Sequence, residues 1–361
     1  MEFKTELIND INSRELDENQ TDALINKLLE YKYDTLGKRA LYYDMMQYIK
    51  DKTDLRSEKF VTGFNSIDRY AKIKRGGMTF VSAYTNHGKS LFLHNMVINQ
   101  IAYYAKLGRK FKVVFFNYED TNYDVMQHFC YLYFLRQLYL KKDTFPKSVY
   151  RYTYEEYEKR STDKNDFIYG YDNNACAFLS QYIFTNDMEF NTDLIAIKLD
   201  KMLEDNKDIL EVVIDYIQLV PCNKKTFARY LEVKDILFEL KKIAKERNVA
   251  MVSACQYNQD TKYREKKSIC RIANVHETKD IAKISDLFIS LWNQTTWDIA
   301  EENQDIPDDM HSVEIDILKA RKQNLKIGLP FLLEKNYGLI NQCNNPIENK
   351  TAYKAEVDFN A

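Results

Sequence analysis

The sequence predicts an α/β fold with a mostly parallel central sheet, preceded by a short helical segment. Three observations predict this fold. Short β-rich runs alternate with helical stretches from about residue 60 onward, as they do where crossover helices join parallel strands. A Gly-Lys-Ser sequence at residues 88–90 lies between an apolar run and a helical stretch. An aspartate, Asp215, ends another apolar run.

Composition excludes several classes of protein. The 361 residues include 52 Lys and Arg and 54 Asp and Glu, which leaves a formal net charge of −2. A polyanionic partner would therefore have to meet a local basic patch. Hydrophobic residues make up 45% of the chain, and its 9 glycines and 5 prolines are too few for a collagen-like or disordered protein. The length suits one large domain with a small appendage, or two modest domains.

Neither membrane insertion nor export is indicated. Apolar runs such as residues 113–116 are far shorter than the ~20 residues of a membrane-spanning helix. The N-terminus lacks the basic and then apolar order of a signal peptide. The six cysteines include no Cys-x-x-Cys pair, which favours reduced thiols over a disulfide framework or a zinc site. We therefore expect a cytoplasmic protein with no membrane partner.

Residues 1–58 are expected to form a helical segment that ends in a polar linker. Thr21 is a candidate N-cap, one apolar stripe follows from Leu24, and a second begins at Leu41. Helices this short are marginal in water, so their apolar stripes must pack on something else. They are expected either to dock on a neighbouring subunit or to cap their own core.

The core is expected over residues 59–345, followed by a loose tail at 346–361. Strands are expected at residues 79–83, 112–118, 182–185, 211–215, 249–254 and 287–292, with helical stretches between them such as 89–106 and 230–247. The Tyr-rich stretch from 140 to about 174 is expected to form helices and loops at the edge of the sheet. Residues 313–318 and 327–333 are expected to form a hairpin.

The sharpest functional signal is the loop at residues 83–90. It follows an apolar strand and opens a helix, a setting in which backbone N–H groups and a helix N-terminus face a phosphate. Lys89 would reach the terminal phosphates and Ser90 would ligate Mg²⁺. Ala83 replaces the first glycine of the usual motif, so a chance Gly-Lys-Ser turn is the alternative. The candidate nucleotide-binding residues here are Ala83, Asn86, His87, Gly88, Lys89 and Ser90.

Two carboxylates are expected at the same edge of the sheet. Asp215 ends a strand that should be buried on both faces, where an unpaired carboxylate is costly and phosphate-bound Mg²⁺ would give it a partner. Glu119 follows another strand, and the carboxyl ends of parallel strands converge, so it could polarise a water that attacks the γ-phosphate. The alternatives are an aspartate that caps the next turn and a glutamate that merely follows its strand.

The order of these motifs resembles the RecA-like ATPase core of the DnaB-type replicative helicases. The resemblance runs from about residue 60 to 340. Its most specific parts are the alanine-first loop and the Ile-Asp-Tyr-Ile-Gln-Leu string at 214–219, neither of which is usual in nucleotide kinases or small GTPases. Further matches lie at residues 62–68, 255–258, Glu277, Asp286, 319–321 and 337–338.

The resemblance implies ATP and Mg²⁺ as cofactors and a role for each matched residue. Lys89 and Ser90 would hold the phosphates and the metal, Asp215 would support the metal, and Glu119 would be the catalytic base. Gln256 matches the family's sensor of the γ-phosphate. The alternative for Gln256 is an ordinary polar residue at a strand end.

The resemblance also implies sites that are shared between subunits. Lys319 and Arg321 match the Lys-x-Arg pair that the family inserts into the neighbouring subunit's site, where a guanidinium stabilises charge on the transferred phosphoryl group. The family closes such head-to-tail contacts into a six-membered ring. The alternative for Arg321 is a solvated surface side chain.

Single-stranded DNA is the implied polymer partner, and residues 261–283 hold the candidate contacts. Basic groups beside tyrosines suit a single strand, through phosphate neutralisation and base stacking; a solvated charged loop is the alternative. The family grips the backbone with an arginine, a glutamate and a nearby glycine, whereas residues 276–279 here are His-Glu-Thr-Lys. The candidate DNA-binding residues are Lys262, Arg264, Lys266, Lys267, Arg271, His276, Glu277 and Lys279.

The expected function is that of an ATP-dependent DNA helicase in replication. It would form a homo-hexamer, translocate on single-stranded DNA and meet replication proteins such as a primase or a loader. A short chain of this kind would suit a phage or plasmid replicon. The alternative is a RecA-like DNA-binding ATPase, a recombinase or loader, that does not unwind. A third interpretation is an interaction module that keeps the fold but has no catalytic activity. The presence of Lys89, Ser90, Asp215 and Glu119 argues against it.

Overall fold

The computed structural model describes residues 58–140, 152–223, 226–258, 272–275, 280–296, 310–321 and 327–342. The expected N-terminal helices and C-terminal tail lie outside these residues, so the proposed boundaries at 58 and 345 stay predictions. No helix in the described part of the chain is long and apolar enough to cross a membrane.

Strands and helices alternate along the described chain. A small antiparallel pair, β1 (Lys59–Phe60) and β2 (Ile73–Lys74), flanks α4 (Asn65–Asp68). The remaining strands are β3 (Met78–Ala83), β4 (Lys112–Asn117), β5 (Ile183–Asn186), β6 (Ile209–Asp215), β7 (Ala250–Gln256), β8 (Leu287–Asn293), β9 (Met310–Ala320), β10 (Ile327–Glu334) and β11 (Leu339–Gln342). The remaining helices are α5 (Lys89–Lys106), α6 (Asn122–Leu140), α7 (Tyr154–Ser161), α8 (Phe167–Leu179), α9 (Thr192–Asp205), α10 (Arg229–Glu246) and α11 (Ile281–Ile284), with 3₁₀ turns η4 (Ile217–Leu219), η6 (Ile272–Asn274) and η7 (Lys335–Tyr337).

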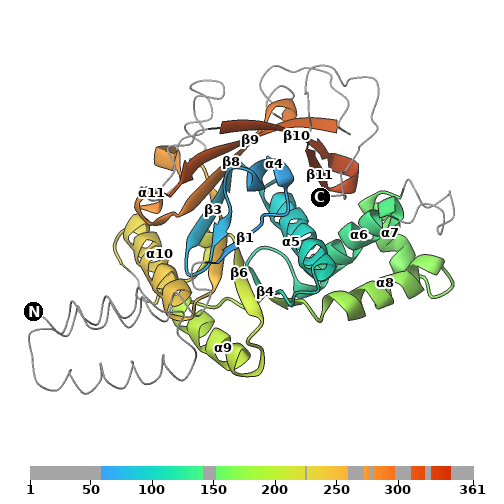
Figure 1. The fold of residues 1–361 in the computed structure, drawn as a ribbon, viewed down its shortest axis with the longest axis horizontal. Helices are drawn as coiled ribbons and strands as arrows, with labels where there is room; N and C mark the ends of the chain where they lie inside the picture. The colour runs from blue at the N-terminus through green and yellow to red at the C-terminus, as the bar shows by residue number, and fades with distance from the viewer. Residues whose placement is uncertain are drawn as a thin grey trace, which may run out of the picture. The chain divides into compact units, whose positions relative to one another are not determined.

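One mixed sheet organises these elements (Figure 1). Among the described residues it has nine strands in the order β11-β10-β9-β8-β3-β7-β6-β4-β5. Six neighbouring strands, β8, β3, β7, β6, β4 and β5, pair in parallel. Strands β9, β10 and β11 extend the sheet beyond β8 in antiparallel fashion. The expected α/β class with a mostly parallel sheet is therefore confirmed, as is the hairpin, which is formed by β9 and β10.

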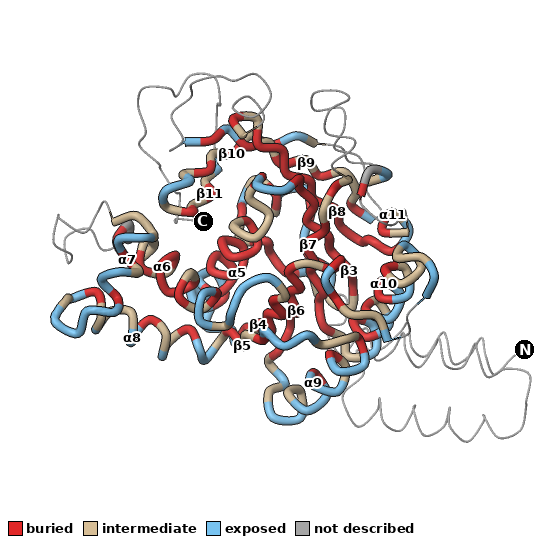
Figure 2. Tube along the Cα trace, turned by 180° about the vertical axis from the view of Figure 1, so that it is seen from behind, coloured by how far each residue is buried: buried red, intermediate tan, exposed pale blue. Residues whose placement is uncertain are grey.

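Helices cover both faces of the parallel part of the sheet. Successive side chains of a strand point to opposite faces, and β3 shows the consequence: Met78 and Phe80 pack in one cluster with α10, and Val81 and Ala83 pack in another with α5. Strands buried on both faces are continuous apolar runs rather than alternating ones. Figure 2 shows the buried residues along these strands and on the inner faces of the helices.

Two of the helices between the strands, α6 and α9, were not located individually from the sequence. In α6, Phe129 and Leu132 pack in the central core, whereas Tyr131 and Phe134 join a separate cluster with α7 and α8. A helix that buries two faces has no single apolar stripe to mark its period. Because α6 packs on two sides, its sequence shows no clear helical period from which its bounds could be predicted.

A carboxyl group is buried near the start of β6. Glu211 is completely buried, and its Oε2 accepts a hydrogen bond from Gln100 Nε2 at 3.0 Å. Gln100 Nε2 also donates to the Val61 carbonyl at 2.9 Å. Burial raises the pKa of Glu211 to about 8, although the hydrogen bond from Gln100 acts in the opposite direction. Glu211 therefore remains protonated in the folded protein at neutral pH.

We predict that Glu211→Gln removes a pH dependence of stability between about pH 5 and 8. The folded state keeps the proton to about pH 8, whereas the unfolded chain releases it near 4.5. Stability therefore falls as the pH rises through this interval, by at most about 1.4 kcal/mol per pH unit. The variant should gain most stability near pH 8.

Urea unfolding at pH 5, 6.5 and 8 measures this slope. Glu204→Gln, at an exposed glutamate of α9, is the matched control and should keep the wild-type slope. Equal slopes for wild type and Glu211→Gln would contradict a protonated Glu211.

Candidate nucleotide-binding site

The loop at residues 83–90 joins the carboxyl end of β3 to the first residue of α5. Asn86 and Gly88 take left-handed φ angles of 64° and 88°, and Gly88 is the N-cap of α5 without a side-chain hydrogen bond. The first N–H groups of a helix have no intrahelical acceptor. Together with the positive end of the helix dipole they can bind an anion, so the geometry of the loop fits the phosphate cradle that the sequence predicts.

Aromatic side chains of the loop pack against residues of β8 and of the end of β7. Tyr84 is buried, and its ring centroid lies 5.1 Å from that of Tyr257 on one side and 6.1 Å from that of Trp292 on another. His87 is also buried, and its Nδ1 accepts a hydrogen bond from the backbone N–H of Asn293 at 3.0 Å. These contacts attach the loop to β8 and to the end of β7. Ala83, at the position of the usual glycine, is fully buried in the core below the loop.

The two expected carboxylates lie at the same edge of the sheet. Asp215 ends β6 and is opposite Asn117, the last residue of β4. Glu119 follows two residues later and is exposed, and its backbone N–H donates to Asn117 Oδ1 at 3.2 Å. The amino group of Lys89 lies 4.6 Å from the ring centroid of Tyr216, directly after Asp215. The fold therefore brings Lys89, Asp215 and Glu119 to one place.

Asp215 has the surroundings of a metal-supporting carboxylate. Burial raises its pKa, whereas the charge of Lys89 and a hydrogen bond with the Ser90 side chain lower it. Its Oδ1 is buried and has no hydrogen-bond partner among the described residues, an arrangement that is costly unless a ligand supplies the missing interaction. Mg²⁺ prefers oxygen ligands and is commonly shared with substrate phosphates. Ser90 and Asp215 therefore fit a phosphate-bound Mg²⁺.

Gln256 connects the loop to two neighbouring strands. It ends β7 opposite Ala83 of β3, and its Nε2 donates to Thr85 Oγ1 at 2.5 Å. Its backbone N–H donates to Gln218 Oε1 at 3.3 Å, and Gln218 lies in η4, directly after β6. Sequence reasoning missed Thr85 and Gln218, although both fall within the matched motifs. These two hydrogen bonds link the loop at Thr85 to the end of β7 and, through Gln218, to the turn after β6.

Arg321 and Lys319 lie at the opposite edge of the sheet. β9 pairs its last residue, Ala320, with Leu287 at the start of β8, and Leu287 lies beside Thr79 at the start of β3. The six residues of β3, at a rise of ~3.3 Å each, span about 20 Å. Arg321 therefore cannot reach the phosphate loop of its own chain. Lys319 Nζ donates to the Ala282 carbonyl at 2.6 Å.

All eight candidate DNA-binding residues, from Lys262 to Lys279, lie outside the described residues, so their role stays a prediction. The described residues that flank them are close to the nucleotide site. Tyr257 forms an antiparallel bridge with Val275, its backbone N–H donates to the Ala83 carbonyl at 3.2 Å, and its hydroxyl donates to Ser290 Oγ at 2.9 Å. The end of β7 therefore lies beside the candidate nucleotide-binding loop and precedes residues 259–271 by only a few residues.

The fold is RecA-like, and the loop between β3 and α5 has the geometry of a phosphate-binding loop. Comparison with known families gives the narrower assignment, because the profile of the DnaB-like helicase C terminal domain matches residues 60–335. The chain belongs to the family of DnaB-like helicase C-terminal domains. The resemblance that the sequence motifs indicated is thereby confirmed.

Curated relatives agree with this assignment. The replicative DNA helicase DnaB of Helicobacter pylori is 23% identical over 297 residues, which cover 81% of this chain and 55% of the relative. That of Mycobacterium intracellulare is 28% identical over 124 residues, which cover 34% of this chain and 20% of the relative. The chain thus spans little more than half the length of its Helicobacter relative.

Solved structures share the fold. A DnaB-like replicative helicase, described together with its interactions with primase, matches 93% of this chain and 73% of its own with a TM-score of 0.61 and 16% identity. A solved ATPase domain matches 85% of this chain and 99% of its own with a TM-score of 0.62 and 17% identity. At these identities the likeness establishes the fold and no more.

We predict that Asp215→Asn weakens Mg²⁺-dependent nucleotide binding by about 10- to 100-fold. The variant keeps the size of the side chain but loses the charge that would support the metal, so binding without Mg²⁺ should change little. Titration calorimetry with a non-hydrolysable ATP analogue, in Mg²⁺ and in EDTA, measures both affinities.

Asp205→Asn, at an exposed aspartate that ends α9, is the control and should bind as the wild type does. An equal loss of affinity in Mg²⁺ and in EDTA would show that Asp215 acts on the protein rather than on the metal.

Proposed function

We propose that this protein is an ATP-driven motor that translocates on single-stranded DNA and unwinds the duplex ahead of it, as a ring of identical subunits. The observation that carries the proposal is the separation of Lys89 and Arg321 to opposite edges of one sheet. A nucleotide held at the carboxyl edge of one subunit needs a second copy to supply the arginine. Head-to-tail contacts of this kind close into rings when the rotation permits.

Within one subunit, the chain's own residues bind the nucleotide and prepare the water. The N-terminus of α5 and Lys89 would bind the phosphates, and Ser90 and Asp215 would hold Mg²⁺. When bound, the metal neutralises phosphate charge and polarises the phosphoryl group that is transferred. Glu119, exposed at the end of β4, would orient the attacking water and accept its proton.

Between subunits, Arg321 would approach the phosphoryl group from the neighbouring chain. A guanidinium there stabilises the charge that develops on the transferred group. Lys319 lies two residues earlier on β9 and would contribute a second positive charge. Hydrolysis would thus depend on the relative position of two subunits, which is how a chemical step can drive movement between them.

Gln256 supports a path from the nucleotide to DNA. Its hydrogen bond to Thr85 would change when the γ-phosphate is lost, and the end of β7 leads within three residues into the basic stretch after Asn258. The basic side chains from Lys262 to Lys279 would contact the single strand. A primase as partner is proposed by analogy with the solved relative that was described with primase, and a loader as partner is proposed from the family resemblance alone.

A strand-displacement assay tests the proposal. The wild type should separate a forked duplex only with ATP and Mg²⁺, and Lys89→Ala should abolish both displacement and DNA-stimulated ATP hydrolysis, because the phosphates lose their main cation. Lys106→Ala, at an exposed lysine near the end of the same helix, should behave as the wild type.

DNA-stimulated hydrolysis with filament formation and strand exchange, but without displacement, would overturn the proposal in favour of a recombinase. Equal rates of DNA-stimulated ATP hydrolysis in the wild type and Lys89→Ala would show that the protein is an interaction module without catalytic activity.

We predict that Glu119→Gln traps the ATP-bound state. Removing the base should lower the rate of hydrolysis by about 10²- to 10⁴-fold, while the affinity for ATP stays near that of the wild type because Glu119 does not hold the phosphates. Single-turnover hydrolysis and filter binding of labelled ATP measure the two quantities. The control is Glu155→Gln, at an exposed glutamate of α7; normal turnover in Glu119→Gln would remove Glu119 from the reaction.

A further inference from the structure

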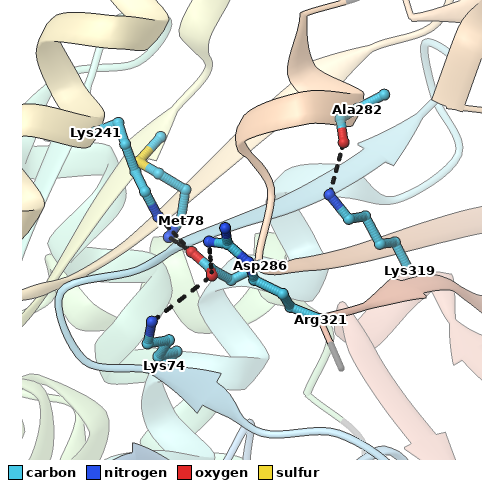
Figure 3. A network of polar contacts seen from close by, with 7 residues as sticks. All are labelled: Lys74, Met78, Lys241, Ala282, Asp286, Lys319 and Arg321. Atoms are coloured by element: carbon cyan, nitrogen blue, oxygen red, sulfur yellow. Dashed lines mark hydrogen bonds and ion pairs between the residues drawn. The ribbon is translucent and has the colours of Figure 1, made fainter. Parts of the chain in front are cut away.

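A buried carboxylate, Asp286, is surrounded by cations at the amino edge of the sheet (Figure 3). The residue is 4% exposed. Its Oδ2 accepts hydrogen bonds from the Lys241 amino group and, at 3.1 Å, from the backbone N–H of Met78. Its Oδ1 accepts from Arg321 Nη1 at 3.0 Å and lies 3.9 Å from Lys74 Nζ. The described neighbours of this one carboxylate thus include three cationic side chains.

The backbone fixes Asp286 and Arg321 against each other as well. The N–H of Arg321 donates to the Asp286 carbonyl at 2.7 Å, and the N–H of Asp286 donates to the Met78 carbonyl at 2.8 Å. Gly77 leaves the room that the carboxylate needs, because a Cβ there would lie 3.0 Å from Asp286 Oδ2 and 2.8 Å from the Lys74 carbonyl oxygen. The position of Asp286 is therefore set by β2, β3 and α10 together.

Asp286 carries its charge although it is buried. Burial by itself would raise its pKa, but hydrogen bonds from Lys241, Arg321 and the backbone of Met78 outweigh burial, so the pKa lies below its ordinary value. The Arg321 side chain, by contrast, remains 57% exposed. Arg321 is thus anchored on the protein by a fixed charge and still open to an incoming group.

We propose that Asp286 is a positioning residue for the nucleotide site of the neighbouring subunit, because it holds the Arg321 guanidinium in one orientation at the subunit surface. An exposed arginine otherwise samples many rotamers, and ordering it at the moment of reaction would oppose catalysis. This inference rests on the proposed function. Lys241, which lies on α10, bonds the other carboxylate oxygen, and the backbone N–H of Met78 bonds that oxygen as well, so Asp286 keeps a fixed partner without Lys241.

Two inactive variants first test arginine donation alone. Lys89→Ala removes a subunit's own nucleotide site but keeps its Arg321, and Arg321→Ala does the reverse while still binding nucleotide. Each variant by itself should hydrolyse no ATP, and an equimolar mixture should regain hydrolysis. A mixture that stays inactive would overturn arginine donation between subunits, and the role of Asp286 with it.

Asp286→Asn is then added to one partner of that mixture at a time. On the Lys89→Ala subunit, which donates the arginine, it should lower the regained kcat by about 10- to 100-fold and leave KM for ATP unchanged. On the Arg321→Ala subunit, which holds the nucleotide, it should leave the regained rate unchanged. A loss that is equal on both subunits would show a structural role, and a gain on the donor would show an inhibitory latch; either result overturns the proposal.

A double variant that removes both charges of the Lys241–Asp286 pair separates a loss of positioning from a loss of stability. Asp286→Asn leaves Lys241 partly buried without its carboxylate, which can destabilise the fold. The double variant Lys241→Met with Asp286→Asn removes both charges, and Lys241→Met alone is its control. On the arginine donor, the double variant should lose the regained rate and the control should keep it. Equal rates for the two would overturn the proposal whatever the stability of Asp286→Asn.

Discussion

Parallel pairing of the six strands β3 to β8 is the constraint on which the candidate site depends. It puts the carboxyl ends of β3, β4, β6 and β7 at one edge, and so gathers Lys89, Asp215, Glu119 and Gln256 from positions far apart in the chain. The antiparallel return of β9 has the opposite effect, because it carries Arg321 to the amino edge beside the start of β3. In the proposed mechanism these two edges are the two halves of one site, and stacking of identical subunits would join them.

Three buried carboxyl groups differ in charge and in hydrogen bonding because their surroundings differ. Glu211 avoids a buried charge by keeping its proton. Asp286 keeps its charge because cations and a backbone N–H surround it. Asp215 has one buried oxygen without a hydrogen-bond partner in the described part of the chain, and it faces Lys89 and Ser90. The incompletely satisfied carboxylate is therefore the one that fits an external ligand.

Local signals made much of this arrangement predictable. Apolar runs between helical stretches predicted the six parallel strands within a few residues of their bounds. The Gly-Lys-Ser loop and the end of β6 indicated the candidate nucleotide site at the carboxyl edge of the sheet. The rest depends on tertiary contacts. Helix α6 packs on two faces and so has no clear period, and the partners of Asp286 lie 35 and 45 residues away for Arg321 and Lys241. No local pattern indicates that these side chains meet, nor that Thr85 contacts Gln256.

The central claim is that a nucleotide site is complete only between two copies of the chain. The most direct measurement follows ATP turnover per subunit through a dilution series, at saturating ATP and oligonucleotide, with the assembled fraction measured on the same samples by mass photometry. The account predicts that turnover falls in proportion to the assembled fraction and that isolated subunits bind ATP without hydrolysing it. Undiminished turnover by isolated subunits would contradict it.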